Sequence, residues 1–142
     1  MPDRAPEPPL RVRLLGDPAL LLAGGGTVAL ERRAAALLAL VILEPGIARQ
    51  RAAPMLWPDS ADPRRNLRQQ LLRFKQSFGQ SLVDAGHELA LMPGVLHDLD
   101  TDSPAALLGE TDGIAGDAFD AWLAAQRRAR RRRLGDAARA RL

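Results

Sequence analysis

The run AAALLALVIL, from Ala34 to Leu43, is apolar at every position and limits the fold more than any other segment. Its length predicts a helix, and a helix that is apolar nearly all round is a buried one. Glu44-Pro45-Gly46 ends this helix, because proline cannot continue it. Other parts of the chain must therefore cover the helix on several sides.

The composition favours a core of packed helices and excludes several chemistries. The 142 residues are 46% hydrophobic but only 4% aromatic, so aliphatic side chains must fill the core. Cysteine is absent, which excludes disulfides, thiolate catalysis and cysteine-based zinc sites. The formal net charge of +3 favours an anionic partner.

The N-terminal sequence MPDRAPEPPL has acids and prolines where a secretory signal peptide has an apolar run. The longest apolar stretch is also far shorter than the roughly 20 residues of a membrane-spanning helix. We therefore expect a soluble protein of the cytoplasm with no membrane partner. Residues 1–9 are rich in proline and are expected to form a flexible leader.

Short apolar segments before the buried helix predict a small antiparallel sheet. Residues 10–14 alternate between apolar side chains and arginines, which is typical of a strand with one wet face. Residues 19–23 and 27–30 can pair with this strand. Gly24-Gly25-Gly26 would form a turn, because the lysine and the following helix of a phosphate-binding loop are not in register.

Two further helices are expected after the buried one. The first spans Arg49 to Trp57 and contains Pro54. A proline inside a continuous helix costs roughly 3 kcal/mol, so this helix should be kinked or start late. A turn at 58–63 separates it from the second helix, which spans Arg64 to Phe78 and ends at Gly79.

A hairpin is expected within residues 81–99. Its arms would be Ser81–Val83 and Glu88–Met92, with Ala85-Gly86 at the tip. After it, Asp102-Ser103-Pro104 is a good helix start within residues 98–108.

A long helix is expected from Asp117 to the end of the chain, after a loop at 111–117. Its arginine-rich run 127–133 is interpreted as a wet face, and a basic binding surface is the alternative. The side chains expected to face inward are Phe119, Trp122 and Leu123. No capping residue or helix breaker follows Leu142, so we expect a chain that is truncated within this helix.

The order of these elements predicts an α+β fold of the winged helix-turn-helix kind. It has a small N-terminal antiparallel sheet and a C-terminal wing hairpin, followed by C-terminal helices. Residues 10–99 would form the winged-helix domain after the leader at 1–9, and residues 100–142 would begin a helical domain.

The helix expected at 64–78 carries several cations and no acid. With 3.6 residues per turn, the apolar stripe that faces the core consists of Leu67, Leu71, Phe74 and Phe78. Arginine and glutamine dominate the opposite face. These side chains can contact guanine and adenine edges in a major groove, and the cations can neutralise phosphates. The residues predicted to bind DNA are Arg64, Arg65, Arg68, Gln69, Leu72, Arg73, Lys75 and Gln76.

Position on this helix predicts different roles for its side chains. Arg65 and Gln69 lie near the centre of the outward face and should mostly meet bases. Arg68 and Lys75 lie on the flanks and should mostly meet phosphates. Leu72 could touch a thymine methyl group or pack on a partner protein.

Several segments carry a family resemblance. They are LRVRLLGDPAL at 10–20, VALERRAAALLALVILEPG at 28–46, RQRAAPMLWPD at 49–59 and DPRRNLRQQLLRFKQSFG at 62–79. The chain resembles the N-terminal half of SARP/BTAD-type bacterial transcriptional activators, whose DNA-binding part is an OmpR/PhoB-type winged helix. HELALMPGVLHDLD at 87–100 is similar to the wing strand of that family. GIAGDAFDAWLAAQRRARRRRL at 113–134 is similar to the opening of its tetratricopeptide-like transcriptional activation domain.

The resemblance implies a regulator that sits on direct repeats of double-stranded DNA as a head-to-tail homodimer and contacts RNA polymerase. It also implies structural roles for Leu56 and Trp57. The chain departs from the family at the wing tip, 84–88, which has no Arg or Lys. We therefore expect modest DNA affinity for a lone copy, raised by a second copy on a repeated site.

Enzymatic and metal-binding functions are not predicted. His87 and His97 have no HxH or HExxH spacing around them, so no metal or other cofactor is expected. The chain has neither a cysteine nucleophile nor a phosphate-binding loop. The remaining alternative is a non-enzymatic protein-interaction module that uses a degenerate winged helix.

Overall fold

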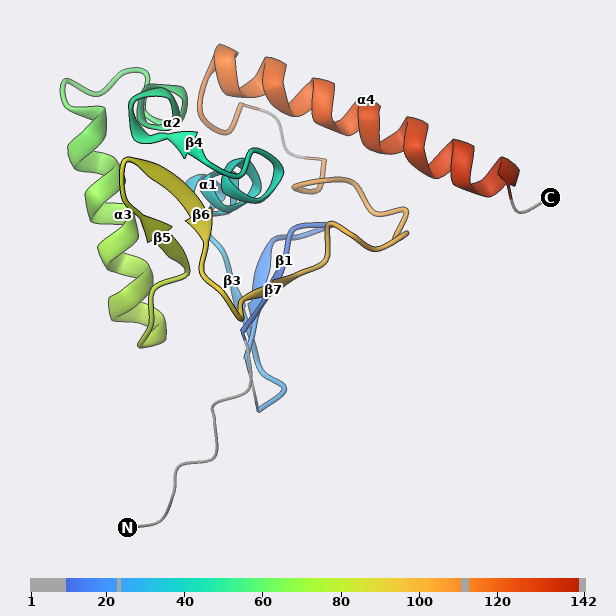
Figure 1. Ribbon diagram of the computed structural model, residues 1–142, viewed down its shortest axis with the longest axis horizontal. Coiled ribbons are helices and arrows are strands. Elements are labelled where there is room, and N and C mark those ends of the chain that lie inside the picture. Colours follow the sequence, from blue (N-terminus) through green and yellow to red (C-terminus); the bar gives the residue numbers. More distant parts are fainter. Residues whose placement is uncertain (1–9, 23, 111–112, 141–142) are drawn as a thin grey trace, which may run out of the picture.

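The computed structural model describes residues 10–22, 24–110 and 113–140 and shows an α+β arrangement of short strands and helices (Figure 1). The strands are β1 (Arg11–Arg13), β2 (Ala19–Leu21), β3 (Thr27–Ala29), β4 (Ile47–Ala48), β5 (Val83–Ala85), β6 (Glu88–Leu91) and β7 (Leu96–His97). The helices are α1 (Arg32–Leu43), α2 (Arg49–Leu56), α3 (Pro63–Phe78) and α4 (Asp117–Ala140). The expected leader at 1–9 and the chain end at 141–142 lie outside the described residues.

The predicted buried helix is confirmed as α1. Every residue from Ala34 to Val41 is buried, with an exposed fraction of at most 4%. After the helix, Gly46 turns the chain with a φ of +85°, a conformation that glycine adopts readily. The Gly46 N–H then donates to the carbonyl of Leu89 in β6 at 2.9 Å. α1 is thus the centre on which the other elements pack.

The predicted N-terminal sheet is confirmed and gains a strand. β1 and β3 each pair with β2 in antiparallel order, with Leu20 opposite both Val12 and Val28. β7 lies along the other edge of β1 in parallel register, with His97 opposite Val12. Val12 and Leu20 are completely buried, so one face of this sheet packs on the core.

The predicted hairpin is confirmed, with its first strand displaced toward the tip. β5 and β6 pair in antiparallel order, with Val83 opposite Leu91, and residues 86–87 connect them. The first strand therefore starts later than the expected position, Ser81. β4 pairs with the other edge of β6, which joins the hairpin to the residues immediately before α2.

The predicted short helix is confirmed as α2, with Pro54 inside it. The helix starts at Arg49 and continues through Pro54, so it does not start late. Pro54 and Gln50 are both exposed, so water can reach the Gln50 carbonyl that proline leaves without an N–H partner.

α3 confirms the predicted basic helix and has a definite cap at each end. At its start, the carboxylate of Asp62 accepts from the backbone N–H of Arg65 at 3.1 Å, and Pro63 occupies the first turn. At its end, Gly79 has a φ of 73°, the left-handed conformation in which glycine commonly ends helices.

The helix predicted within residues 98–108 is wrong, and this segment is an irregular connection. The segment hydrogen-bonds instead to Leu14, the residue that follows β1. The N–H of Leu108 donates to the Leu14 carbonyl at 2.7 Å, and the Asp98 carboxylate accepts from the Leu14 N–H at 2.9 Å. Bonds to a distant part of the chain therefore replace the bonds that a helix would make within itself.

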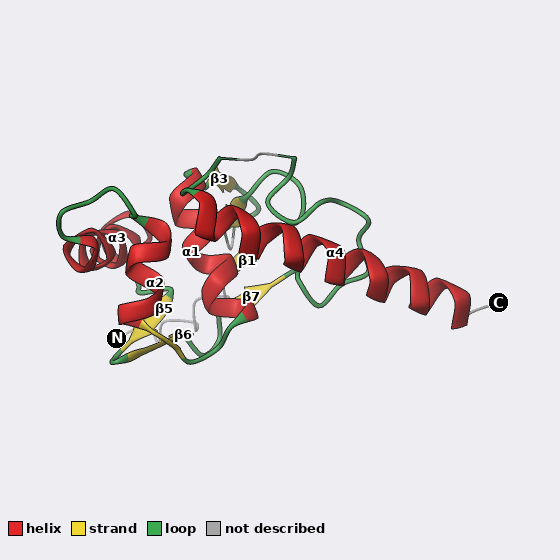
Figure 2. Cartoon of the chain, turned by 90° about the horizontal axis from the view of Figure 1, so that it is seen from above, coloured by secondary structure: helices red, strands yellow, loops and turns green. Residues whose placement is uncertain are grey.

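The predicted C-terminal helix is confirmed as α4, which starts beside α1 and α2 and extends away from them (Figure 2). Phe119 and Leu123 are buried and Trp122 is half-buried, as predicted. The interpretation of the arginine run as a wet face is wrong for Arg130, which is only 6% exposed. None of the helices in the described ranges is both long and apolar enough to cross a membrane.

The carbonyls of the 98–108 segment explain the burial of Arg130. Its guanidinium donates to the carbonyls of Leu99, Thr101 and Ser103 over 2.9 to 3.1 Å. Arg127, one turn earlier, donates to the carbonyls of Leu107 and Gly109. Two arginines of the run therefore satisfy backbone carbonyls that would otherwise lack partners in this irregular segment.

Candidate nucleic-acid interface

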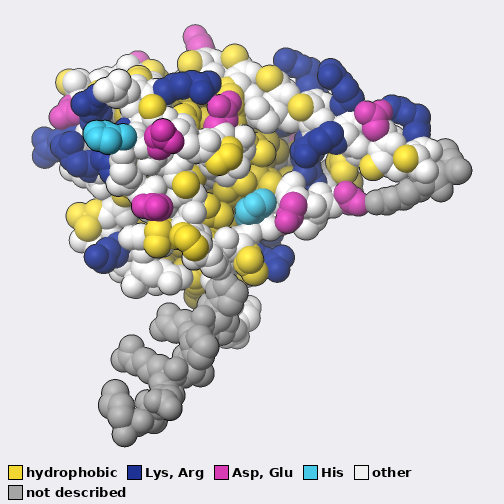
Figure 3. All heavy atoms as spheres, in the orientation of Figure 1, with side chains coloured by type: hydrophobic (Ala, Val, Ile, Leu, Met, Phe, Trp, Pro, Cys, Tyr) yellow, Lys and Arg dark blue, Asp and Glu magenta, His cyan; other side chains and the backbone are white. Residues whose placement is uncertain are grey.

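The side chains predicted to bind DNA lie together on one face of α3, and all of them are exposed: Arg64, Arg65, Arg68, Gln69, Leu72, Arg73, Lys75 and Gln76. On the inward side, Leu67 and Phe74 are 1% and 2% exposed, and Leu71 and Phe78 are half-buried. α3 contains no Asp or Glu. Figure 3 shows Lys and Arg side chains gathered at the edge of the molecule where Figure 1 draws α3.

The turn before α3 is anchored in the core. Leu56 is completely buried and Trp57 is 7% exposed, which agrees with the structural roles expected for both. The guanidinium carbon of Arg33 lies 6.0 Å from the centroid of the Trp57 ring, within reach of a cation–π interaction. This packing fixes the direction in which the chain enters α3.

A groove of about 770 Å³ separates the start of α3 from the tip of the β5–β6 hairpin. We call it the hairpin groove. It is lined by Ala48, Arg49, Gln50, Arg64, Leu67, Arg68, Ala85, Gly86, His87 and Glu88. The cations Arg64 and Arg68 of α3 therefore face a hairpin tip that carries a histidine and a carboxylate.

Arg49 holds the hairpin tip against α2. Its guanidinium donates to the Ala85 carbonyl at 3.1 Å, and its backbone N–H donates to the His87 carbonyl at 3.0 Å. Its Nε is buried and has no hydrogen-bond partner within the described part of the chain. No local pattern predicts this contact, because it depends on the pairing of β4 with β6. A cation thus reaches the tip from α2, although the tip itself has none.

A second groove, of about 610 Å³, lies between the start of α1 and α3. We call it the α1 groove. It is lined by Leu30, Glu31, Arg32, Arg33, Trp57, Asn66, Gln69, Gln70, Arg73 and Ile114. Of these, Gln69 and Arg73 are predicted DNA-binding residues, and Gln70 is only 6% exposed. Arg32, Arg33 and Gln70 were not predicted. The two arginines lie outside α3, and Gln70 is a single polar residue beside the apolar stripe, so none of them belongs to a recognisable pattern.

The two grooves divide the exposed face of α3 into rows. Arg64 and Arg68 border the hairpin groove, whereas Gln69 and Arg73 border the α1 groove. With 100° of rotation per residue, Arg65, Leu72 and Gln76 lie between these rows. The middle row of the exposed face, which lines neither groove, therefore combines one cation, one amide and one apolar side chain.

Leu72 is an apolar residue on this otherwise polar face of α3. It is 53% exposed and is surrounded in the helix by polar side chains. Single exposed leucines are common on protein surfaces and need no special explanation. Its location at the centre of the face nevertheless makes it part of any interface that α3 forms.

The histidines do not form part of a metal site in the described residues. The Nδ1 of His97 accepts from the Leu99 N–H at 3.1 Å, and His87 lies at the hairpin tip, where it is exposed. Within residues 10–22, 24–110 and 113–140, no group of three His, Asp or Glu side chains could hold a metal ion.

No protein-family model matches the sequence, and no curated protein matches it. The resemblance to SARP/BTAD-type activators therefore stays a prediction.

Proposed function

We propose that this chain is a sequence-specific DNA-binding regulator of transcription that inserts α3 into the major groove. The observation that carries the proposal is the exposed face of α3, which combines arginine, lysine and glutamine with no carboxylate. Such a face attracts phosphates through charge, and its arginines and glutamines can make paired hydrogen bonds to base edges.

The arrangement around α3 supports a winged helix-turn-helix. α2 precedes α3 through the turn at 57–62, and the β5–β6 hairpin follows α3 and pairs with β4. In this proposal, α2 and α1 support the recognition helix and the hairpin is the wing. Arg49 holds the wing tip close to the backbone that flanks the major groove.

The resemblance extends the proposal to partners. A head-to-tail homodimer on direct repeats would place two recognition helices on one site, and contact with RNA polymerase would make the protein an activator. A second copy raises the effective concentration of the first one at its site. This matters here because the hairpin tip, residues 84–88, has no Arg or Lys of its own, which favours modest affinity for one copy.

Leu72 supports a second candidate function. An apolar side chain that is 53% exposed at the centre of the α3 face suits a protein-interaction module that docks a partner through a degenerate winged helix. The two candidates differ in salt dependence. DNA binding that neutralises phosphates weakens steeply as salt rises, whereas docking on Leu72 would depend on apolar contact.

A mobility-shift assay at two salt concentrations tests the proposed function. We expect the unmutated protein to shift duplex DNA at low salt and to lose most of this binding at higher salt. A variant with Arg64→Gln, Arg65→Gln and Arg68→Gln should lose the shift. The matched control changes exposed arginines of α4 in the same way, Arg128→Gln, Arg131→Gln and Arg132→Gln, and should keep it. No shift by the unmutated protein at low salt would favour the protein-docking function.

A further inference from the structure

The α1 groove brings together arginines that are distant in the sequence. Arg32 and Arg33 come from the first turn of α1, and Arg73 comes from the middle of α3. The acid that lines this groove is Glu31, so cations outnumber acids in it. All three arginines are exposed, and none of them forms an ion pair within the described residues.

The start of α1 is unusual in its charge. Helix N-termini favour acidic side chains, because their free N–H groups carry partial positive charge. Here the first turn has no acid, and Glu31 makes no side-chain hydrogen bond that caps the helix. Arg32, Arg33 and the free N–H groups therefore give this end of the groove a positive potential, which the Glu31 carboxylate opposes in part.

Gln70 gives an independent indication of a ligand. Its side chain lines the groove and is only 6% exposed. It makes no hydrogen bond within the described part of the chain. The amide atoms are not sealed from solvent, so this donor is available at the edge of the groove to bind a phosphate oxygen.

We infer that the α1 groove is a second phosphate-binding site, which holds the DNA backbone on the side of α3 that faces α1. The inference rests on the proposed function of α3. Arg64 and Arg68 would meet the backbone on the hairpin side of the major groove. Arg32, Arg33 and Arg73 would meet the backbone on the opposite side, so α3 would be held between two rows of phosphate contacts.

The test measures DNA affinity by fluorescence anisotropy across a series of salt concentrations. Each phosphate contact contributes about 0.9 to the slope of log affinity against log salt. Arg32→Gln with Arg33→Gln should therefore lower the slope by about two, on preferred and random duplexes alike. The control, Arg131→Gln with Arg132→Gln on α4, removes the same charge and should leave the slope unchanged.

Arg33 also stacks on Trp57, so the double variant could lose affinity through loss of packing. Arg32→Gln alone avoids this contact and should still lower the slope by about one. Gln70→Leu separates binding from stability. It should weaken binding to all duplexes and leave the thermal melting temperature nearly unchanged, because the Gln70 side chain makes no hydrogen bond in the described part of the free protein that the change would break.

The outcomes distinguish this inference from the proposed function. If the unmutated protein binds DNA with a steep salt slope and Arg32→Gln leaves that slope unchanged, the α1 groove is not a phosphate site and the function of α3 stands. If the slope falls as predicted, the groove is part of the interface. If the unmutated protein does not bind duplex DNA at low salt, the function and the second site are both overturned.

Discussion

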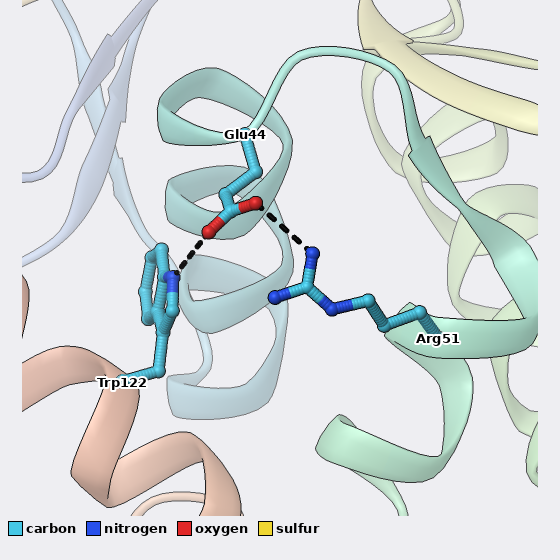
Figure 4. Close-up of polar contacts among 3 residues, drawn as sticks. All are labelled: Glu44, Arg51 and Trp122. Atoms are coloured by element: carbon cyan, nitrogen blue, oxygen red, sulfur yellow. Dashed lines mark hydrogen bonds and ion pairs between the residues drawn. The ribbon is translucent and has the colours of Figure 1, made fainter.

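The indole N–H of Trp122 on α4 donates a hydrogen bond of 3.0 Å to the carboxylate of Glu44, the residue that follows α1 (Figure 4). The other carboxylate oxygen of Glu44 pairs with Arg51 of α2 at 3.1 Å. A single carboxylate therefore connects the C-terminal helix to the end of α1 and to α2, the helix that packs against α3.

The Trp122 contact gives the first prediction. Trp122→Phe should lower the free energy of unfolding by about 1 kcal/mol, because the carboxylate loses a donor. A ring is kept to pack on Phe119, whose centroid lies 5.3 Å from that of Trp122. Urea unfolding measures the change. Arg51→Ala is the comparison and should cost less than about 1 kcal/mol, since this arginine side chain is largely exposed. Unchanged stability of Trp122→Phe would contradict the prediction.

Arg130 gives the second prediction. Arg130→Met keeps most of the side-chain volume but leaves the carbonyls of Leu99, Thr101 and Ser103 without their donors. We expect a loss of about 2–3 kcal/mol in urea unfolding and faster amide exchange in residues 98–109. The neighbouring Arg131→Met is the control and should change stability by less than about 0.5 kcal/mol, because Arg131 is exposed. Similar losses in both variants would show that the buried arginine has no special structural role.

The pKa of Arg130 does not add a pH dependence near neutrality. Burial lowers this pKa and the nearby Arg133 acts in the same direction, while Asp98 and Asp102 oppose the change. A lowered pKa in the folded state means that the charged form is less favoured there than in the unfolded chain. An arginine nevertheless stays charged near neutral pH, so the stabilisation by its hydrogen bonds should be constant there.

The cap of α3 gives the third prediction. Asp62→Ala should destabilise the protein by about 0.5–2 kcal/mol, because the first turn of α3 loses the acceptor for the Arg65 N–H. Asp59→Ala, in the same turn and also exposed, removes the same charge without removing a cap. Thermal unfolding of both variants at matched salt separates the effect of the cap from the effect of charge. Equal melting temperatures of the two variants would contradict the capping role.

The inward stripe of α3 gives the fourth prediction. Phe74→Ala should cost about 3–5 kcal/mol, because its ring is 2% exposed in the core. That loss is a large part of the stability of a small domain. Leu72→Ala, two residues away on the exposed face, should change stability by less than about 0.5 kcal/mol. A melting temperature of Phe74→Ala within a degree or so of the unmutated protein would show that α3 does not pack as described.

The helices that were predicted correctly have a clear pattern of apolar and charged residues within their own sequence. The apolar run at 34–43 predicted α1, and the cations with an apolar stripe predicted α3. β7 and the pairing of β4 with β6 were missed, because strands of two residues carry no periodicity. The helix start at Asp102-Ser103-Pro104 was overridden by bonds to Leu14 and to Arg130, neither of which a local pattern contains.

The same distinction applies to the candidate site. Helical periodicity was enough to place the predicted residues of α3 on one exposed face. Arg32, Arg33 and Gln70 join them only because the start of α1 and α3 border the same groove, and Arg49 joins them only because β4 pairs with the hairpin. Contacts between elements that are distant in the sequence determine this outer part of the site, and no spacing along the chain encodes them.

An NMR titration of backbone amides with a short DNA duplex selected from a random pool locates the surface that binds DNA. We expect the largest chemical-shift changes within α3, at residues such as Arg65, Gln69 and Gln76, with smaller changes at Arg32 and at the hairpin tip. Changes confined to the exposed arginines of α4, or no changes at low salt, would contradict the assignment of α3 as the DNA-binding helix.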